Sequence, residues 1–357
     1  MIVADRTFFI MRLIRPILRQ GAWQRCPHVV STACWLLGLV TTLLAVQPAW
    51  SVTCTTESQM NNAQRAEYVR ALRELEAPIL AGNSGAVKAM TIPAVASSFD
   101  GIAQSIETLS PQIQGGTFTV SGMYLLNATD LKGGEEETQF FCSVNGSSLV
   151  VTVTIPQLPP GTYLLALLHA TGVEHPQQVS MILQQDAGAW KLAGFFARPM
   201  SLGGREGVWY WMQARQYSQK KQDWPAYFYY QTAAFLLTPV DFLSSPNFEK
   251  LQKETQSVRP PDLPGAEPMK LAAAGGKTFE ITALRTDSFS GELDLVVNYK
   301  TASVADPAAV RTEILELMKT LLLAHPELRG AFHGLWVYAE APGRQPFAIE
   351  LPMGQIS

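Results

Sequence analysis

Apolar residues between positions 57 and 113 recur at intervals of three and four, which is the period of helices that bury one face. The clearest stripe consists of Val95, Phe99, Ile102, Ile106, Leu109 and Ile113. An earlier helix over about residues 63–77 is expected to end at Pro78, because proline lacks the N–H of the helical hydrogen bond. The stripe is too short to indicate a coiled coil, so we expect these helices to cover a sheet.

The next segment, up to residue 198, shows the two-residue alternation of β-strands. Apolar residues alternate with threonine over residues 149–155, and the Asn-Gly pair at 145–146 is a strong hairpin signal. The strand at 162–170 is apolar on both faces and is therefore expected at the centre of a sheet. A second hairpin should pair residues 179–185 with residues 189–197.

Residues 205–257 are helical in pattern and rich in aromatic side chains. This segment resembles one tetratricopeptide hairpin at six positions, which are Tyr210, Ala214, Tyr217, Ala226, Tyr230 and Ala233. The turn between the two helices is expected at Trp224-Pro225, where proline can open the second helix.

A single repeat of this kind cannot bury its own apolar face, so the hairpin must pack against something else. One interpretation is a helical wedge between two domains, which the apolar surface all round the second helix favours. The other is a docking face for a protein partner. The candidate partner surface consists of Trp209, Trp211, Trp224 and Tyr227.

A proline-rich linker around residues 257–268 precedes the C-terminal segment. Asp306 is expected to cap a helix there, with Pro307 at its first position. Strands on either side of this helix are expected over residues 278–284, 292–299, 335–341 and 347–352. The order strand-strand-helix-strand-strand predicts one helix on a four-stranded antiparallel sheet.

Two helices followed by about six antiparallel strands, closing on Trp190 to Phe196 after the turn at Asp186, resemble the nuclear-transport-factor-2-like cone. The resemblance covers about residues 57–200, and the proline-rich break at 156–160 departs from it. Such a cone implies a pocket between the curved sheet and the helices. The residues that would line it are Tyr163, His169 and Trp190, each of which also fits ordinary sheet packing.

These patterns predict an α+β protein in which helices pack on a curved antiparallel sheet, followed by a helical hairpin and a small ββαββ domain. The expected parts are a signal peptide or membrane anchor at 1–51, a cone-like domain at 52–200, a tetratricopeptide-like segment at 201–258 and the ββαββ domain at 259–357.

The residue pattern of the N-terminal segment predicts that the protein is exported. Five arginines precede residues 26–56, which hold no charged side chain, and Val29–Val46 is nearly all apolar. Small residues at Ala49 and Ser51 complete the pattern of a secretory signal cleaved after Ser51. The apolar run is also just long enough to remain as an anchor. With the arginines inside, both outcomes place the rest of the chain in the periplasm or on the outer side of the cytoplasmic membrane.

Charge and cysteine content change once this segment is set aside. Residues 1–51 hold five of the 27 basic residues and one of the 30 acidic residues, so the remainder carries −7 instead of −3. This negative net charge disfavours nucleic acid and an anionic membrane as partners. A membrane contact is expected only through the N-terminal segment, if that segment is not cleaved. Only Cys54 and Cys142 remain, and we expect them to form a disulfide in an oxidising compartment.

No recognised catalytic, phosphate-binding or dinucleotide-binding motif occurs in the sequence. The histidines after residue 51 lack metal-ligand spacing, so no catalytic residue, metal site or cofactor is predicted. The sequence therefore favours an exported, non-catalytic binding or scaffold protein of the cell envelope that engages a protein or a small ligand. The alternative is a cone-type small-molecule-binding protein or enzyme with its pocket within residues 57–200.

Overall fold

The computed structural model describes residues 52–144, 149–289 and 291–357. These residues form an α+β protein, as the sequence predicts, with strands grouped into four sheets. The expected signal or anchor at 1–51 and the expected turn at 145–146 lie outside the described residues. Among the helices that are described, none combines the length and the apolar character needed to cross a membrane.

The first half of the described chain contains a five-stranded antiparallel sheet in the order β1-β2-β5-β6-β7. Its strands are β1 (Thr53–Thr56), β2 (Thr117–Asn127), β5 (Thr162–Thr171), β6 (Gln177–Asp186) and β7 (Ala189–Pro199). Strand β5 is central, and β6 and β7 form the expected hairpin. A bulge in β2 next to Gly122 explains why apolar residues alternate imperfectly there.

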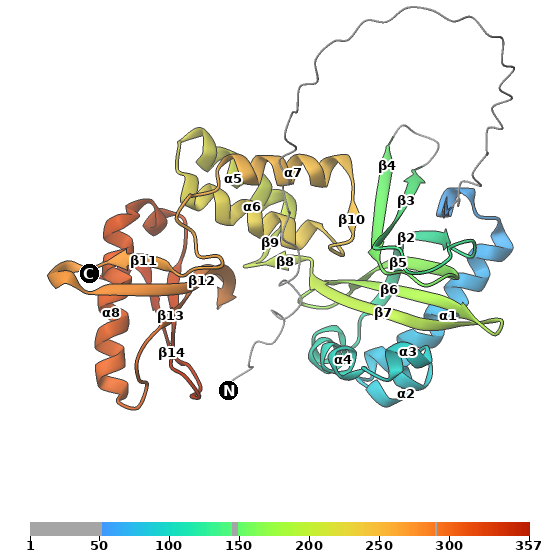
Figure 1. Ribbon diagram of the computed structural model, residues 1–357, viewed down its shortest axis with the longest axis horizontal. Helices are drawn as coiled ribbons and strands as arrows, with labels where there is room; N and C mark the ends of the chain where they lie inside the picture. Colours follow the sequence, from blue (N-terminus) through green and yellow to red (C-terminus); the bar gives the residue numbers. More distant parts are fainter. Residues whose placement is uncertain (1–51, 145–148, 290) are drawn as a thin grey trace, which may run out of the picture. The chain divides into compact units, whose positions relative to one another are not determined.

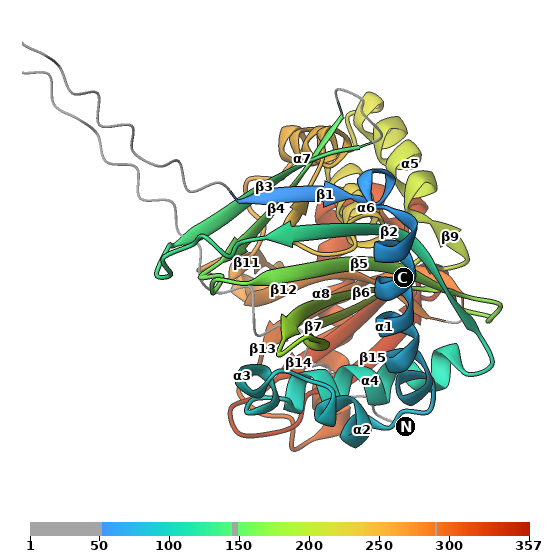
Figure 2. The same ribbon diagram turned by 90° about the vertical axis from the view of Figure 1, so that its right-hand side faces the viewer.

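Helices cover one face of this sheet (Figure 1). They are α1 (Asn62–Leu80), α2 (Ser84–Ala89), α3 (Pro93–Ala96) and α4 (Asp100–Ile113). Figure 2 shows α1 crossing in front of β5 and β6. Phe99, Ile106 and Ile113 of the predicted stripe are buried in one apolar cluster with the helix-facing residues Leu164 and Leu168 of β5. The helices therefore cover a sheet, as their pattern predicts.

The predicted end of the first helix at Pro78 is wrong, because α1 continues to Leu80 with Pro78 in its last turn. Proline in the last turn removes one backbone hydrogen bond of the helix. The next residue, Ile79, is fully buried in the apolar cluster under the sheet. We infer that this burial outweighs the missing hydrogen bond.

A second, three-stranded sheet lies against the other face, in the order β10-β4-β3. Its strands are β3 (Glu137–Ser143), β4 (Val150–Pro156) and the short β10 (Leu243–Ser244). Phe140 and Val153 of this sheet share an apolar cluster with Leu165 of β5. A disulfide joins Cys54 of β1 to Cys142 of β3, with their Cα atoms 5.2 Å apart. The bond therefore ties the edge of the large sheet to the small one.

The segment after β7 forms the expected helical hairpin. It comprises β8 (Ser201–Leu202), β9 (Arg205–Glu206), α5 (Gly207–Gln219), α6 (Asp223–Leu237) and then α7 (Pro246–Ser257). The turn lies around Lys221, which has a positive φ of 58°, and not at Trp224-Pro225 as predicted. Pro225 instead lies in the first turn of α6. Backbone N–H groups in the first turn have no hydrogen-bond acceptor within the helix, so the lack of an N–H in proline removes no helical hydrogen bond there.

Helix α6 packs on both of its sides. Nine of its residues are buried, and it shares a single apolar cluster with α5, α7 and the C-terminal sheet. At its end, the side chain of Gln178 from β6 donates a buried hydrogen bond of 2.7 Å to the carbonyl of Leu236. The hairpin is thus continuous with the C-terminal core, as a wedge would be.

The predicted four-stranded antiparallel C-terminal sheet is wrong in two respects. The sheet has five strands, in the order β11-β12-β13-β14-β15, and β13 and β14 are parallel. The elements are β11 (Met269–Ala272), β12 (Thr278–Phe289), β13 (Glu292–Lys300), α8 (Pro307–Ala324), β14 (Gly334–Glu340) and β15 (Phe347–Pro352). Helix α8 returns the chain to the starting end of β13, so the next strand must run parallel to it.

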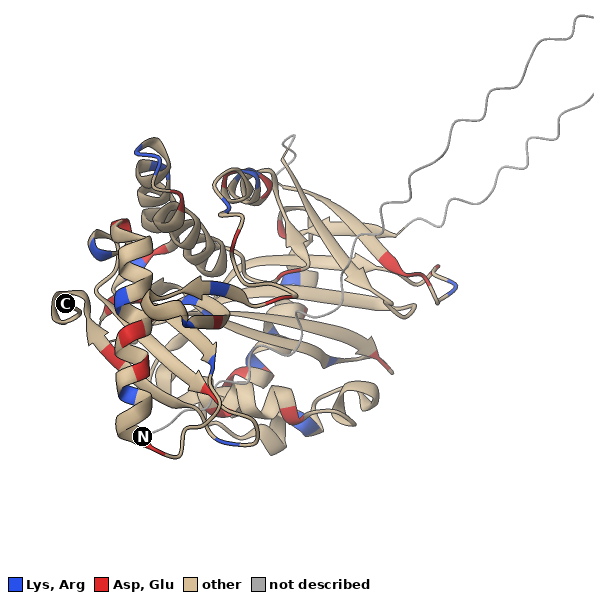
Figure 3. Ribbon diagram, turned by 60° about the vertical axis from the view of Figure 1, so that its left-hand side comes forward, with Lys and Arg blue, Asp and Glu red and all other residues tan. Residues whose placement is uncertain are grey.

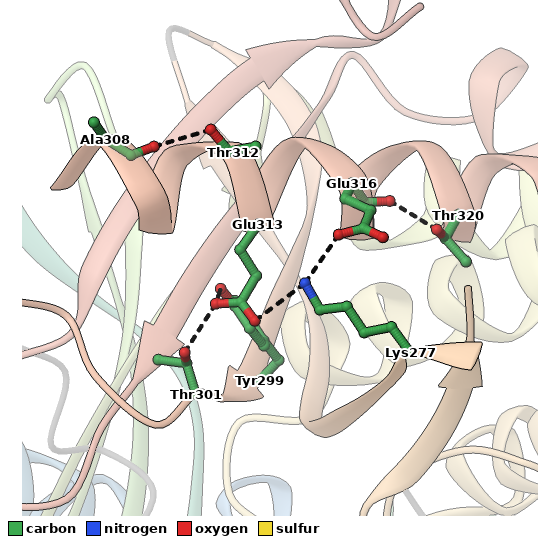
Figure 4. Close-up of polar contacts among 8 residues, drawn as sticks. All are labelled: Lys277, Tyr299, Thr301, Ala308, Thr312, Glu313, Glu316 and Thr320. Carbon is green, nitrogen blue, oxygen red and sulfur yellow. Dashed lines mark hydrogen bonds and ion pairs between the residues drawn. The ribbon is translucent and has the colours of Figure 1, made fainter. Parts of the chain in front are cut away.

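Helix α8 begins as predicted, since the Asp306 side chain accepts hydrogen bonds from the backbone of Ala308 and Ala309. Its apolar stripe is buried on the sheet. On its polar side, Glu313 accepts hydrogen bonds from Tyr299 and Thr301 (Figure 4). Lys277 forms ion pairs with Glu313 and with Glu316, which lies one helical turn later. These contacts fix the rotation of α8 relative to β13.

We predict that the disulfide contributes about 4 kcal/mol to the free energy of unfolding, because it closes a loop of 88 residues. Urea unfolding of Cys54→Ala without reductant should show this loss. Reductant should produce the same loss in the wild type and none in the variant. Labelling of Cys54 and Cys142 as free thiols in the folded, unreduced protein would contradict the prediction.

Candidate functional site

The three residues predicted to line a cone pocket do not converge. Tyr163 is buried in the cluster between the two sheets, and its hydroxyl donates to the carbonyl of Pro159 at 2.8 Å. His169 lies on the same face of β5, since side chains two positions apart point the same way. Trp190 lies on the opposite, helix-covered face, where its Nε1 donates to Glu67 of α1 at 2.7 Å.

A pocket of about 230 Å³ remains on the helix-covered face, between α1 and the start of β2. We call it the α1–β2 pocket. Its lining residues are Val69, Leu72, Arg73, Glu76, Phe118, Thr119, Val120 and Leu168. Glu76 already accepts a hydrogen bond from the backbone of Phe118. The α1–β2 pocket thus contains one arginine and one engaged carboxylate, and no histidine.

The four aromatic residues predicted as a partner surface do not gather on one exposed face. Trp224 is 6% exposed, with its ring centroid 3.8 Å from that of His325. Trp211 donates from Nε1 to Glu254 of α7 at 2.7 Å, and Tyr227 accepts a hydrogen bond from Gln231. Trp209 lines a pocket. Most of these aromatic side chains therefore make contacts within the chain.

Trp209 contributes to a pocket of about 170 Å³, the hairpin pocket, between the helical hairpin and the start of β13. The remaining lining residues are Gly203, Arg205, Tyr210, Tyr229, Glu292, Leu293, Ala331 and His333. The Arg205 guanidinium lies 5.2 Å from the centroid of the Trp209 ring, a cation–π distance. Aromatic walls with a few polar groups are typical of small-ligand sites.

Two tyrosine hydroxyls in this wall are held by backbone carbonyls. Tyr210 donates to Leu202 at 2.8 Å, and Tyr229 donates to Ala331 at 2.5 Å. Burial raises the pKa of Tyr210 to about 12, and it also raises the pKa of Tyr229. Both phenols are therefore neutral near pH 7.

His333 connects the hairpin pocket to a cluster of two carboxylates. It lies just before β14, and its Nδ1 is 3.0 Å from Oδ1 of Asp294 in β13. Glu350 of β15 completes the cluster, in which one donor atom from each residue lies within 4.8 Å of the others. Three neighbouring strands thus bring together one imidazole and two carboxylates, which we call the Asp294–His333–Glu350 cluster.

The two carboxylates of the cluster are poorly satisfied. Asp294 is fully buried, and among the described residues neither its Oδ2 nor the buried Oε1 of Glu350 has a hydrogen-bond partner. Burial raises the pKa of Asp294, although hydrogen bonds from His333 and from the backbone of Gly334 offset part of the increase. Burial and the nearby charge of Asp294 raise the pKa of Glu350. Buried charges normally have close partners, so this arrangement requires an explanation.

Sequence reasoning missed this cluster because its members are 17 to 56 positions apart and meet only through strand pairing. One signal was present in the sequence. Asp294 interrupts the run Leu293, Leu295, Val296 and Val297, whose apolar residues indicate a strand buried on both faces. A carboxylate at such a position indicates a paired or ligating group.

No family model, curated protein or solved structure matches this chain. The roles of the hairpin pocket and the cluster therefore rest on their geometry and chemistry.

We predict that Glu254 stabilises the packing of α5 on α7. It accepts hydrogen bonds from Trp211 and from both Nε and Nη2 of Arg215. Burial alone would raise the pKa of Glu254, but these donors outweigh it and lower the pKa below 4.5. Glu254→Gln should lower the free energy of unfolding at pH 7 by about 1 to 2 kcal/mol.

The folded-state pKa of Glu254 lies below its unfolded value, so its contribution is present above pH 4.5 and is lost as the pH falls through the folded pKa. Urea unfolding at several pH values should show the gap between variant and wild type closing on acidification. Glu249→Gln, an exposed position on the same helix, is the control. An equal effect of the two substitutions would contradict the prediction.

Proposed function

We propose that the chain is an exported, non-catalytic binding protein of the cell envelope that holds a small polar ligand in the hairpin pocket. The observation that carries this proposal is the convergence of Arg205, Trp209 and His333 on one cavity. A volume of about 170 Å³ is below the roughly 300 Å³ of pockets for drug-sized molecules, so the ligand is small.

The side chains that line the hairpin pocket favour binding of a ligand over catalysis. Both tyrosine hydroxyls are committed as donors to backbone carbonyls, and Arg205 lies over the Trp209 ring. A ligand with an anionic group facing Arg205 and an apolar part against Trp209 suits these walls.

The disulfide and the charge distribution support an extracytoplasmic setting and a small ligand. Disulfides persist mainly in oxidising compartments, and this one joins two strands of different sheets. Acidic and basic residues are mixed along the ribbon in Figure 3. A mixed surface with net negative charge disfavours a nucleic-acid partner.

A second candidate is a small-molecule site in the cone-like domain. The α1–β2 pocket favours it, because it is the larger of the two pockets and contains Arg73. Its walls are otherwise mainly apolar, and its carboxylate is already hydrogen-bonded. We therefore rank it below the hairpin pocket.

A thermal-shift screen of small anionic metabolites against the full chain tests both candidates. A ligand present at 100 times its Kd should add about 2.7 kcal/mol of stability to the wild type. Ala331→Leu, which fills the hairpin pocket, should abolish this shift. Val120→Phe, which fills the α1–β2 pocket from the helix-covered face, should leave it intact.

Arg205→Gln provides a second test in case Ala331→Leu impairs folding, because Arg205 is an exposed residue. It should weaken binding of anionic ligands without lowering the melting temperature of the free protein. If the shift is lost in Val120→Phe and kept in both hairpin-pocket variants, the function would be assigned to the α1–β2 pocket instead. No shift from any compound would contradict the proposal.

A further inference from the structure

We propose that the Asp294–His333–Glu350 cluster is a binding site for a first-row divalent metal ion, with zinc as the ion that fits its donors best. The inference goes beyond the proposed function, because the ion would bind whether or not the hairpin pocket is filled. It rests on the distances within the cluster, on two unpartnered buried oxygens and on the absence of a side chain at Gly334.

The distances within the cluster are those between two ligands of one ion. Donor atoms that each lie 2.0 to 2.2 Å from a metal are separated by about 3 to 3.5 Å. Nδ1 of His333 and Oδ1 of Asp294 are 3.0 Å apart, and all three donor atoms lie within 4.8 Å of one another. A small rotation of the Glu350 side chain would bring the third donor into range.

Two buried carboxylate oxygens of the cluster lack a partner within the part of the chain that the structure describes. Asp294 has no exposed surface, and its Oδ2 accepts no hydrogen bond from any of these residues. Oε1 of Glu350 is also buried and unpartnered. One imidazole cannot neutralise two carboxylates, whereas a divalent cation between them would pair with both.

Gly334 keeps space free beside Oε1 of Glu350 and Oδ1 of Asp294. A Cβ atom at this position would lie 3.0 Å from Oε1 of Glu350 and 3.1 Å from Oδ1 of Asp294. It would also lie only 2.7 Å from the carbonyl oxygen of Leu351. The chain therefore has no side chain at the point where both carboxylates converge.

One imidazole nitrogen and two carboxylates are donors that favour a particular class of metal ion. Imidazole favours zinc and other first-row ions over magnesium and calcium, which prefer oxygen ligands alone. Three protein ligands leave a further position for water or a ligand atom, as in open zinc sites. The donors are carried by β13, β15 and the residue before β14, so the sheet fixes their spacing.

Isothermal titration of the metal-stripped, disulfide-bonded full chain with ZnCl2 tests the site. We expect a single tight binding event that MgCl2 and CaCl2 do not reproduce. Asp294→Asn and Glu350→Gln, which keep shape and remove charge, should each weaken zinc binding by roughly 100-fold or more. Gly334→Ala should weaken it as well. His175→Asn, at an exposed histidine, should leave binding unchanged.

The stability of the metal-free Asp294→Asn variant separates a metal site from a structural ion pair. If Asp294 is an unfilled ligand, removing its buried charge should leave the melting temperature equal or higher, and zinc should no longer raise it. If Asp294 and His333 form only a structural pair, the substitution should lower the melting temperature. That result, or zinc binding that survives both carboxylate substitutions, would overturn the proposal.

Discussion

The C-terminal half of this protein depends on the burial of helix α6. Nine of its residues are buried, and solvent reaches mainly the stripe formed by Tyr227, Gln231 and Phe235, so most of the helix surface must be covered by other elements. Helices α5 and α7 and the C-terminal sheet share its apolar cluster, while Gln178 of β6 satisfies a carbonyl at its end. The length and composition of one helix thereby determine which elements meet.

The hairpin pocket and the Asp294–His333–Glu350 cluster lie where this packing meets the starting ends of β13 and β14. The hydroxyl of Tyr229 in α6 reaches the carbonyl of Ala331, two residues before His333. The same contact borders the hairpin pocket, and His333 extends from that pocket to the buried Asp294. The packing of helix α6 thus positions both the hairpin pocket and the Asp294–His333–Glu350 cluster.

Patterns that act over a few residues predicted most of the fold. The stripe of α8 with its Asp306 cap, the central strand β5 and the β6–β7 hairpin follow from local periodicity and turn chemistry. The parallel pairing of β13 and β14 depends on where α8 returns the chain, which local patterns do not encode. The Asp294–His333–Glu350 cluster arises from that same pairing, so the sequence reading that missed the parallel strands also missed the site. The opposite faces of His169 and Trp190 likewise required the register of the whole sheet.

The proposed metal ion would lie between Asp294, His333 and Glu350. An anomalous difference map from crystals of the protein grown with zinc, recorded at the zinc absorption edge, gives the sharpest test of this site. We expect a peak about 2.0 to 2.2 Å from donor atoms of these three residues. Peaks confined to exposed residues such as His175, with none among these three side chains, would contradict it.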